Sequence, residues 1–331
     1  MLYQHVPLQA EGTATVIPPR SAADAPVRDC RDARILFDTI AAMLDDETDP
    51  RAALMMLSGG LRVARACFDG DAWRDFCAEL RGHRLATVLA EDPVTALAMA
   101  RPRGYAGDAA LLDLVYAEPA LADALAATTP RGRRINAVTM TAPMHNARRE
   151  CRALLGDYID QAAAASRPVV LSIGAGHLRE ADDSHALRQG RIARWVALDQ
   201  DADSCAEIDR RLGRQVETMA RPIGAILKGD VRVEKIDIAY AAGLYDDLPL
   251  PIAITLARRV VAMLRPGGRF LFTNYAAGLW DAGFMEAVLD WPMHLRSRAE
   301  MARIGDGIAK VTVRHWSGVH GAMHYCELVK H

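Results

Sequence analysis

The fold of this chain is decided by the stretch Val170-Leu-Ser-Ile-Gly-Ala-Gly-His-Leu-Arg179. It predicts a strand, a tight turn and a helix start, because an apolar, β-branched run ends in Gly174-Ala175-Gly176 and a polar segment follows. Glycines in such a turn let a nucleotide-like ligand approach the backbone closely, since no side chain stands in the way. We therefore expect Gly174, Ala175 and Gly176 to bind a ligand. A sharp turn with no binding role is the alternative.

Acidic residues end the next predicted strand, Trp195-Val-Ala-Leu-Asp-Gln-Asp201. In doubly wound folds, a carboxylate at the end of the second strand accepts hydrogen bonds from the two ribose hydroxyls. Asp199 is placed for this role and Asp201 is the second candidate. An aspartate at position 201 also fits the N-cap of a helix over 202–212, and this is the more common role for Asp201.

Further runs predict the rest of a sheet. Ile226-Leu-Lys-Gly-Asp230 resembles a strand that ends on Gly229-Asp230, and a strand from Ile236 breaks into a loop of small residues before Tyr245. A helix ends near Leu264, Pro266-Gly267-Gly268 turns the chain, and an apolar strand continues to Asn274. The last two predicted strands, over 309–316 and 323–329, flank a Gly-containing turn and form a closing hairpin.

This series resembles the class I S-adenosylmethionine-dependent methyltransferase family over roughly residues 167–331. A nicotinamide-binding Rossmann domain is the nearest competitor, but its fingerprint requires a third glycine where this chain has Arg179. The resemblance implies an α/β fold, with a Rossmann-like, doubly wound and mainly parallel sheet. It also implies S-adenosyl-L-methionine as the cofactor.

The resemblance assigns further residues to the cofactor. Asp230, with Val231 beside it, would hold the adenine amino group; a plain turn residue is the alternative for Asp230. Glu180 would contact the amino end of the cofactor or support the turn, although a glutamate in a first helical turn also complements the helix dipole. Ala242 lies in a run of small residues near the expected sulfonium, where it leaves room for a substrate or only packs in the core.

A second resemblance lies upstream, in Arg101-Pro-Arg-Gly-Tyr-Ala-Gly-Asp108 followed by a helix that ends at Tyr116. This motif looks like a smaller bacterial branch of these enzymes, and the stretches 242–246 and 290–298 fit that branch too. The branch implies either synthesis of a 3-hydroxypalmitate methyl ester or cyclisation of S-adenosylmethionine to azetidine-2-carboxylate.

Three residues are the catalytic candidates. Tyr105 would be presented by a helical lid, and its aromatic face would stabilise a sulfonium; Tyr245 is an alternative donor of such a face. Asn146 would orient an amine, with His145 beside it as a base, although lone polar residues on a helix are more often plain surface. Asp108 fits an N-cap as well as a site residue.

The chain divides into two predicted units. Residues 1–130 form an N-terminal arm and a helical cap, and residues 131–331 form the S-adenosylmethionine-binding Rossmann-like catalytic domain. A basic helix is expected over 131–165, and Pro143 should bend or split it.

Composition narrows the classes of partner. The net charge of −2 leaves no basic field for nucleic acid, so we expect a small-molecule substrate. Six cysteines without a C-x-x-C pair indicate free thiols and a cytoplasmic location, and no metal site is expected. No secretory signal and no apolar run of roughly 20 residues is visible, which argues against stable membrane association. Homo-oligomerisation stays open.

The sequence therefore favours an S-adenosylmethionine-dependent transferase. Its expected reaction is methyl transfer to a small or lipid-like hydroxy or carboxylic acid, in secondary-metabolite or signal biosynthesis. One alternative is intramolecular cyclisation of the cofactor to azetidine-2-carboxylate and methylthioadenosine. A second alternative, from another class, is a non-catalytic cofactor-binding regulatory module.

Overall fold

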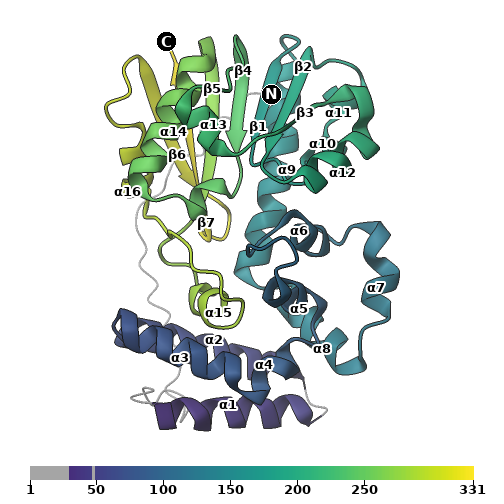
Figure 1. The fold of residues 1–331 in the computed structure, drawn as a ribbon, viewed down its shortest axis with the longest axis vertical. Coiled ribbons are helices and arrows are strands. Elements are labelled where there is room, and N and C mark those ends of the chain that lie inside the picture. Colours follow the sequence, from purple (N-terminus) through teal and green to yellow (C-terminus); the bar gives the residue numbers. More distant parts are fainter. Residues whose placement is uncertain (1–29, 47–48) are drawn as a thin grey trace.

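A seven-stranded sheet stands above a helical cap in the computed structural model, which describes residues 30–46 and 49–331 (Figure 1). The strand order is β3-β2-β1-β4-β5-β7-β6, and β7 alone runs antiparallel to its neighbours. The strands are β1 (Val169–Ile173), β2 (Arg194–Asp199), β3 (Glu217–Ala220), β4 (Ile236–Ala241), β5 (Leu264–Tyr275), β6 (Val311–Ser317) and β7 (Met323–Lys330). The expected Rossmann-like fold, with a doubly wound and mainly parallel sheet, is confirmed.

Helices precede, connect and cover these strands. The cap helices are α1 (Cys30–Asp45), α2 (Pro50–Cys67), α3 (Gly70–Gly82), α4 (Arg84–Leu89), α5 (Pro93–Ala100), α6 (Ala109–Val115), α7 (Ala122–Ala126) and α8 (Pro130–Thr139). The others are α9 (Pro143–Ala163), α10 (Glu180–Asp183), α11 (His185–Arg188), α12 (Ala202–Leu212), α13 (Ile223–Lys228), α14 (Leu250–Met263), α15 (Ala282–Ala287) and α16 (Arg298–Gly305). None of the helices within these described ranges is long and apolar enough to cross a membrane.

Two apolar cores lie on opposite faces of the sheet, because successive side chains of a strand point to opposite sides. On one face, Val170 of β1 packs in a cluster with residues of α9 and of the cap. On the other face, Leu171 and Ile173 pack with residues of α13, α14 and α16. The cap helices therefore contribute to the apolar core on only one face of the sheet.

Most of the predicted elements are confirmed. The strands at 170, 195, 236 and 264 exist, and the closing hairpin is β6 and β7. Pro143 splits the expected basic helix, since α8 ends at Thr139 and α9 begins at the proline. The helix predicted over 202–212 is α12. The expected arm over residues 1–29 lies outside the described residues.

One predicted strand is wrong. Ile226-Leu-Lys belongs to α13, and Gly229 ends that helix in the left-handed conformation at φ +86°. The third parallel strand is instead β3, which the sequence analysis did not find. β3 is an edge strand without a fully buried residue, so it lacks the apolar run that marked the other strands.

The cap is assembled from two distant parts of the chain. α8 lies beyond the boundary expected at residue 130, yet it packs against α2, α4 and α5. α15 follows β5 and packs against α2 and α3, so that the C-terminal half of the chain also enters the cap (Figure 1).

Candidate functional site

The glycine turn closes the carboxyl end of β1. Gly174 has φ +67° and Gly176 has φ +52°, a region that residues with a Cβ rarely adopt. The backbone N–H groups of Gly174 and Ala175 donate to the Leu198 carbonyl at 2.9 and 3.1 Å, which fixes the turn against the end of β2. The strand and turn predicted from the sequence are confirmed, and the short helix α10 begins later, at Glu180.

Asp199 lies directly beneath this turn. Its carboxylate is 7% exposed; Oδ2 accepts from the Gly176 N–H at 2.8 Å, and Oδ1 accepts from the Asp201 N–H at 2.9 Å. Each carboxylate oxygen has a further lone pair to accept a second hydrogen bond. Asp199 therefore has two acceptor atoms available for a pair of hydroxyls above the turn.

Asp201 is the N-cap residue of α12, and it also forms an ion pair with the helical cap. Its Oδ1 accepts from the Asp203 N–H at 3.0 Å, as the capping interpretation predicts. Its Oδ2 lies 2.6 Å from Arg103 Nη1, which also donates to Ser204 Oγ at 2.7 Å. Because this carboxylate is already paired with the cap, Asp199 is the better placed of the two acids to accept from a ligand.

Tyr105 is half-buried beside the same two acids. Burial raises the pKa of its phenol to about 12, and the nearby charges of Asp199 and Asp201 add to the shift. Asp108, three residues on, caps α6 by accepting from the Leu111 N–H at 2.9 Å. The Arg101–Asp108 turn thus lies beside the strand-end acids, and its role as a lid stays a prediction.

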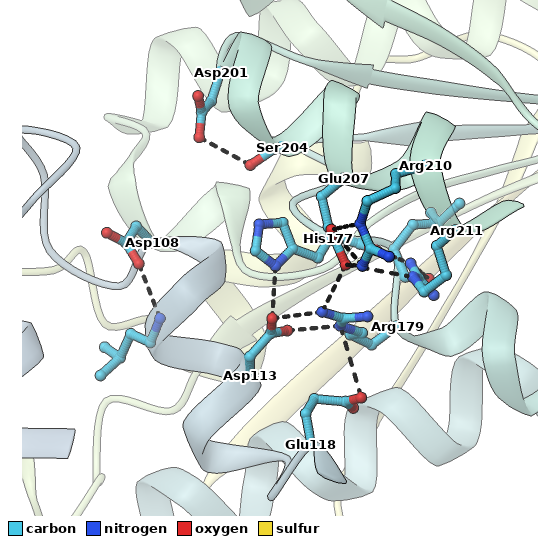
Figure 2. Close-up of polar contacts among 12 residues, drawn as sticks. Asp108, Asp113, Glu118, His177, Arg179, Asp201, Ser204, Glu207, Arg210 and Arg211 are labelled. Atoms are coloured by element: carbon cyan, nitrogen blue, oxygen red, sulfur yellow. Dashed lines mark hydrogen bonds and ion pairs between the residues drawn. The ribbon is translucent and has the colours of Figure 1, made fainter. Parts of the chain in front are cut away.

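Ion pairs join α6 to the residues that follow the glycine turn (Figure 2). Asp113 accepts from Arg179 Nε at 2.7 Å and Nη2 at 2.6 Å, and it contacts His177 Nδ1 at 2.8 Å. Burial alone would raise the pKa of Asp113, but the hydrogen bonds from Arg179 and His177 outweigh it and hold the pKa at about 2. Asp113 is therefore ionised, and α6 is fixed to the turn by charge.

A small cavity of about 50 Å³ lies between the glycine turn, α6 and α9. Glu180 and Tyr240 line it, with the Tyr240 hydroxyl donating to Glu180 Oε1 at 2.6 Å, and burial raises the pKa of Glu180. Ala242 lines it at the end of β4. The cap covers the turn closely, because a Cβ added to Gly176 would lie 3.3 Å from the Ala109 Cβ.

Pockets for small ligands usually measure about 300–1,000 Å³. With α6 in this position, the cavity is smaller than a nucleoside-sized ligand requires. Five of the predicted residues line this one cavity: Gly174, Ala175, Gly176, Glu180 and Ala242. Asp199 lies at its edge, where it accepts from the Gly176 N–H.

The adenine site predicted at Asp230 and Val231 is wrong. Val231 lines a separate open pocket of about 530 Å³ with Lys235, which precedes β4, and with Arg265 at the start of β5. Since β1, β4 and β5 are parallel, this pocket lies at the edge of the sheet opposite to the glycine turn. The error follows from reading α13 as a strand, because a strand would have carried Asp230 to the carboxyl edge.

The catalytic role predicted for Tyr245 is also wrong. Its side chain is fully buried and stacks on Phe272 with ring centroids 4.3 Å apart, in the core on the face away from the cap. Asn146 is not among the residues that line the cavity; it donates to the Thr141 carbonyl at 2.9 Å. His145 is buried against the Thr139 carbonyl, and burial lowers its pKa to about 4.

Sequence reasoning missed one face of α9. Arg148, Cys151, Arg152 and Leu155 line the cavity, and their spacing of three and four residues places them on one side of the helix. That spacing was the available signal. In the sequence alone these residues cannot be distinguished from a polar helix surface, so the pattern assigns no role to Arg148.

Comparisons with known proteins support the fold. No family model matches the chain, and no curated protein matches it. Among solved structures, a possible exported protein from Bordetella parapertussis is 18% identical, with a TM-score of 0.53 over 67% of this chain and 79% of that one. A magnesium protoporphyrin IX methyltransferase from Synechocystis with bound S-adenosylhomocysteine is 12% identical, with a TM-score of 0.44 over 56% of this chain and 85% of that one. The likeness to the Bordetella protein shows a shared fold.

Proposed function

We propose that this protein binds S-adenosyl-L-methionine and transfers its methyl group to a small or lipid-like hydroxy or carboxylic acid. The observation that carries the proposal is the position of Asp199 beneath the glycine turn, at the carboxyl edge of the sheet. Doubly wound folds bind ligands at this edge. Asp199 and the turn would hold the ribose and adenosine, and Glu180 with Tyr240 would lie near the amino-acid end.

The donors and acceptors of the site fit this cofactor. Asp199 offers two oxygens for the ribose hydroxyls. Asp108 Oδ2, on the cap beside Ala109, is buried and lacks a hydrogen-bond partner within the described residues. A hydroxyl or amino group of a ligand above the turn would satisfy this oxygen. Arg179 is engaged with Asp113 where a dinucleotide site needs an open glycine, which argues against a pyrophosphate ligand.

The chain's own residues would act mainly by orientation and exclusion of water. S-adenosylmethionine supplies a methyl group on a sulfonium, which is already an activated electrophile. Holding an acceptor in line with that group is worth on the order of 7–11 kcal/mol. An ionised carboxylate acceptor needs no general base, whereas a hydroxyl acceptor does. His145 would not serve as this base, because it is buried and bonded at the start of α9.

The closed cap favours one alternative. α6 lies close over the glycine turn, and a cap that closed in this way over a bound cofactor would exclude a second substrate. Cyclisation of the cofactor to azetidine-2-carboxylate needs no second substrate. It requires a neutral amine, which a desolvating pocket favours over the charged form.

The products separate these functions. Purified protein is incubated with S-adenosylmethionine, with and without 3-hydroxy and fatty acids, and both thioether products are quantified by chromatography. Methyl transfer predicts S-adenosylhomocysteine only when an acid is present. Methylthioadenosine formed above the protein-free rate, with no acid present, would instead establish the cyclase. Tight binding with neither product would leave the non-catalytic module.

A further inference from the structure

Arg148 on α9 is a buried cation with an unused donor. The residue is 5% exposed and lines the cavity beneath α6. Its Nε donates to the Tyr275 hydroxyl at 3.0 Å and its Nη2 donates to Asp246 Oδ2 at 2.9 Å. Within residues 30–46 and 49–331, Nη1 donates to no protein atom. One edge of the guanidinium is therefore fixed by the protein, and the other has no protein partner.

The backbone is shaped to admit this guanidinium at the end of β4. Gly243 has φ +96°, and a Cβ added there would collide with Nη1 of Arg148. Ala242, the preceding residue, lines the cavity with Arg148. The two small residues therefore let the cation approach the carboxyl edge of the sheet, where doubly wound folds bind their ligands.

The protein's own carboxylates near Arg148 already accept other hydrogen bonds, and none of them accepts from its Nη1. Asp246 Oδ2 accepts from Arg148, and Asp246 Oδ1 accepts from the Tyr275 N–H at 2.7 Å. Glu180, which also lines the cavity, accepts from the Tyr240 hydroxyl. Arg148 lines the cavity, so its Nη1 can donate to a ligand that enters there. The planar fork of arginine is best suited to a carboxylate.

We propose that Arg148 binds a carboxylate of the ligand that occupies this cavity. This inference rests on the proposed function for the identity of that ligand. The carboxylate comes either from an acid substrate or from the amino-acid end of the cofactor. Arg148 lies at the ends of β4 and β5, whereas Asp199 lies at the end of β2, on the other side of β1. Arg148 would therefore contact a part of the ligand other than its nucleoside.

The test compares ligands that differ in their carboxylates. Calorimetry measures the binding of methylthioadenosine, which has none, of S-adenosylhomocysteine, which has one, and of 3-hydroxyoctanoate added to the S-adenosylhomocysteine complex. In Arg148→Gln we expect unchanged affinity for methylthioadenosine. Weakening of S-adenosylhomocysteine by about 10- to 100-fold assigns the carboxylate to the cofactor. The same loss for 3-hydroxyoctanoate alone assigns it to the acid substrate.

Controls keep the outcomes apart. Arg149→Gln changes the neighbouring arginine, which bonds to the Val115 and Met140 carbonyls and is not among the cavity-lining residues, so all affinities should stay the same. If Arg148→Gln does not fold because Asp246 loses its partner, the double variant with Asp246→Asn removes both charges together. Equal affinities in wild type and variant for every ligand would overturn the proposal, as would an equal loss for all three.

Failure of the proposed function would be seen separately. In that case the wild-type protein binds neither adenosine compound, and 3-hydroxyoctanoate is titrated into the protein alone. Loss of that binding in Arg148→Gln still supports the role of Arg148. A wild-type protein that binds none of the three compounds would contradict both proposals.

Discussion

The cap meets the sheet domain in two regions that are held in different ways. At α15 close packing is joined by an ion pair. An added Cβ on Gly283 would be 2.9 Å from the Leu61 carbonyl oxygen of α2, Phe284 is 5% exposed, and Glu286 accepts from Arg65 at 2.8 and 2.9 Å. Where α6 faces the residues after the glycine turn the contact is ionic, with Asp113 paired to Arg179 and His177 (Figure 2). Water can replace an ion pair but not a packed core. We therefore expect the cap to open at α6 and to stay anchored at α15.

The largest expected effect is at α15. Phe284→Ala removes a buried aromatic ring from the cluster shared by α15 and the cap, which should lower the free energy of unfolding by about 3–5 kcal/mol. Urea unfolding followed by circular dichroism measures this change. A loss below about 1 kcal/mol would show that α15 does not anchor the cap.

A second test at the same contact uses pH. Asp281 is 4% exposed and accepts from the Met144 N–H at 2.9 Å, and burial raises its pKa to about 6. A raised pKa in the folded state stabilises below the unfolded value of about 3.9, and this stability is lost as the pH rises through about 6. Asp281→Asn should therefore gain roughly 2 kcal/mol over wild type between about pH 4.5 and about pH 8.

The measurement is the free energy of unfolding of both proteins at each pH. Wild type keeps the pH dependence of its other groups, so only the difference between the two curves counts. Parallel curves would contradict the burial of an ionisable Asp281 beside α9.

Loss of the ionic contact at α6 should change the rates at which the ligand enters and leaves. The pKa of Asp113 is held at about 2, so its contribution is present above about pH 4 and is lost as the pH falls through about 2. At neutral pH, Asp113→Asn should weaken the closed state and speed both entry and release of S-adenosylhomocysteine roughly tenfold, about 1.4 kcal/mol. Stopped-flow binding with parallel urea unfolding checks this. Unchanged rates would contradict opening at α6.

The smallest expected effect is at Tyr105. Its aromatic face, more than its hydroxyl, would stabilise a sulfonium by roughly 0.5–2 kcal/mol. Tyr105→Phe should therefore keep most of the wild-type turnover. Because the ring is only half-buried, Tyr105→Ala should lose about two- to fivefold, near the lower end of that range. Wild-type rates in both variants would remove Tyr105 from the lid.

Local rules predicted the parts of the site that depend on neighbouring residues. Gly174 and Gly176 at the end of an apolar run predict the turn. Asp201 predicts an N-cap, and Pro143 predicts the break at which a new helix begins. Each of these depends on only a few adjacent residues, so one sequence suffices to find them.

Features that depend on distant residues could not be found in the same way. Asp113 meets Arg179 across 66 positions of the chain, and no local pattern pairs them. Tyr245 is stacked in the core on the face away from the cap, a placement set by tertiary packing. The apolar residues of Ile226–Lys228 suit a short helix or a strand equally, and only packing against the core decides between them.

The central claim is that the glycine turn and Asp199 bind the adenosine part of S-adenosylmethionine. Calorimetric titration of S-adenosylhomocysteine into wild type, Asp199→Asn and the exposed control Asp203→Asn tests it most directly. The asparagine keeps one acceptor for the Gly176 N–H but loses the charge and an acceptor for the ribose. The account predicts binding to wild type and control, and an affinity at least about tenfold weaker in Asp199→Asn. Equal affinity in all three proteins, or no binding to wild type, would contradict it.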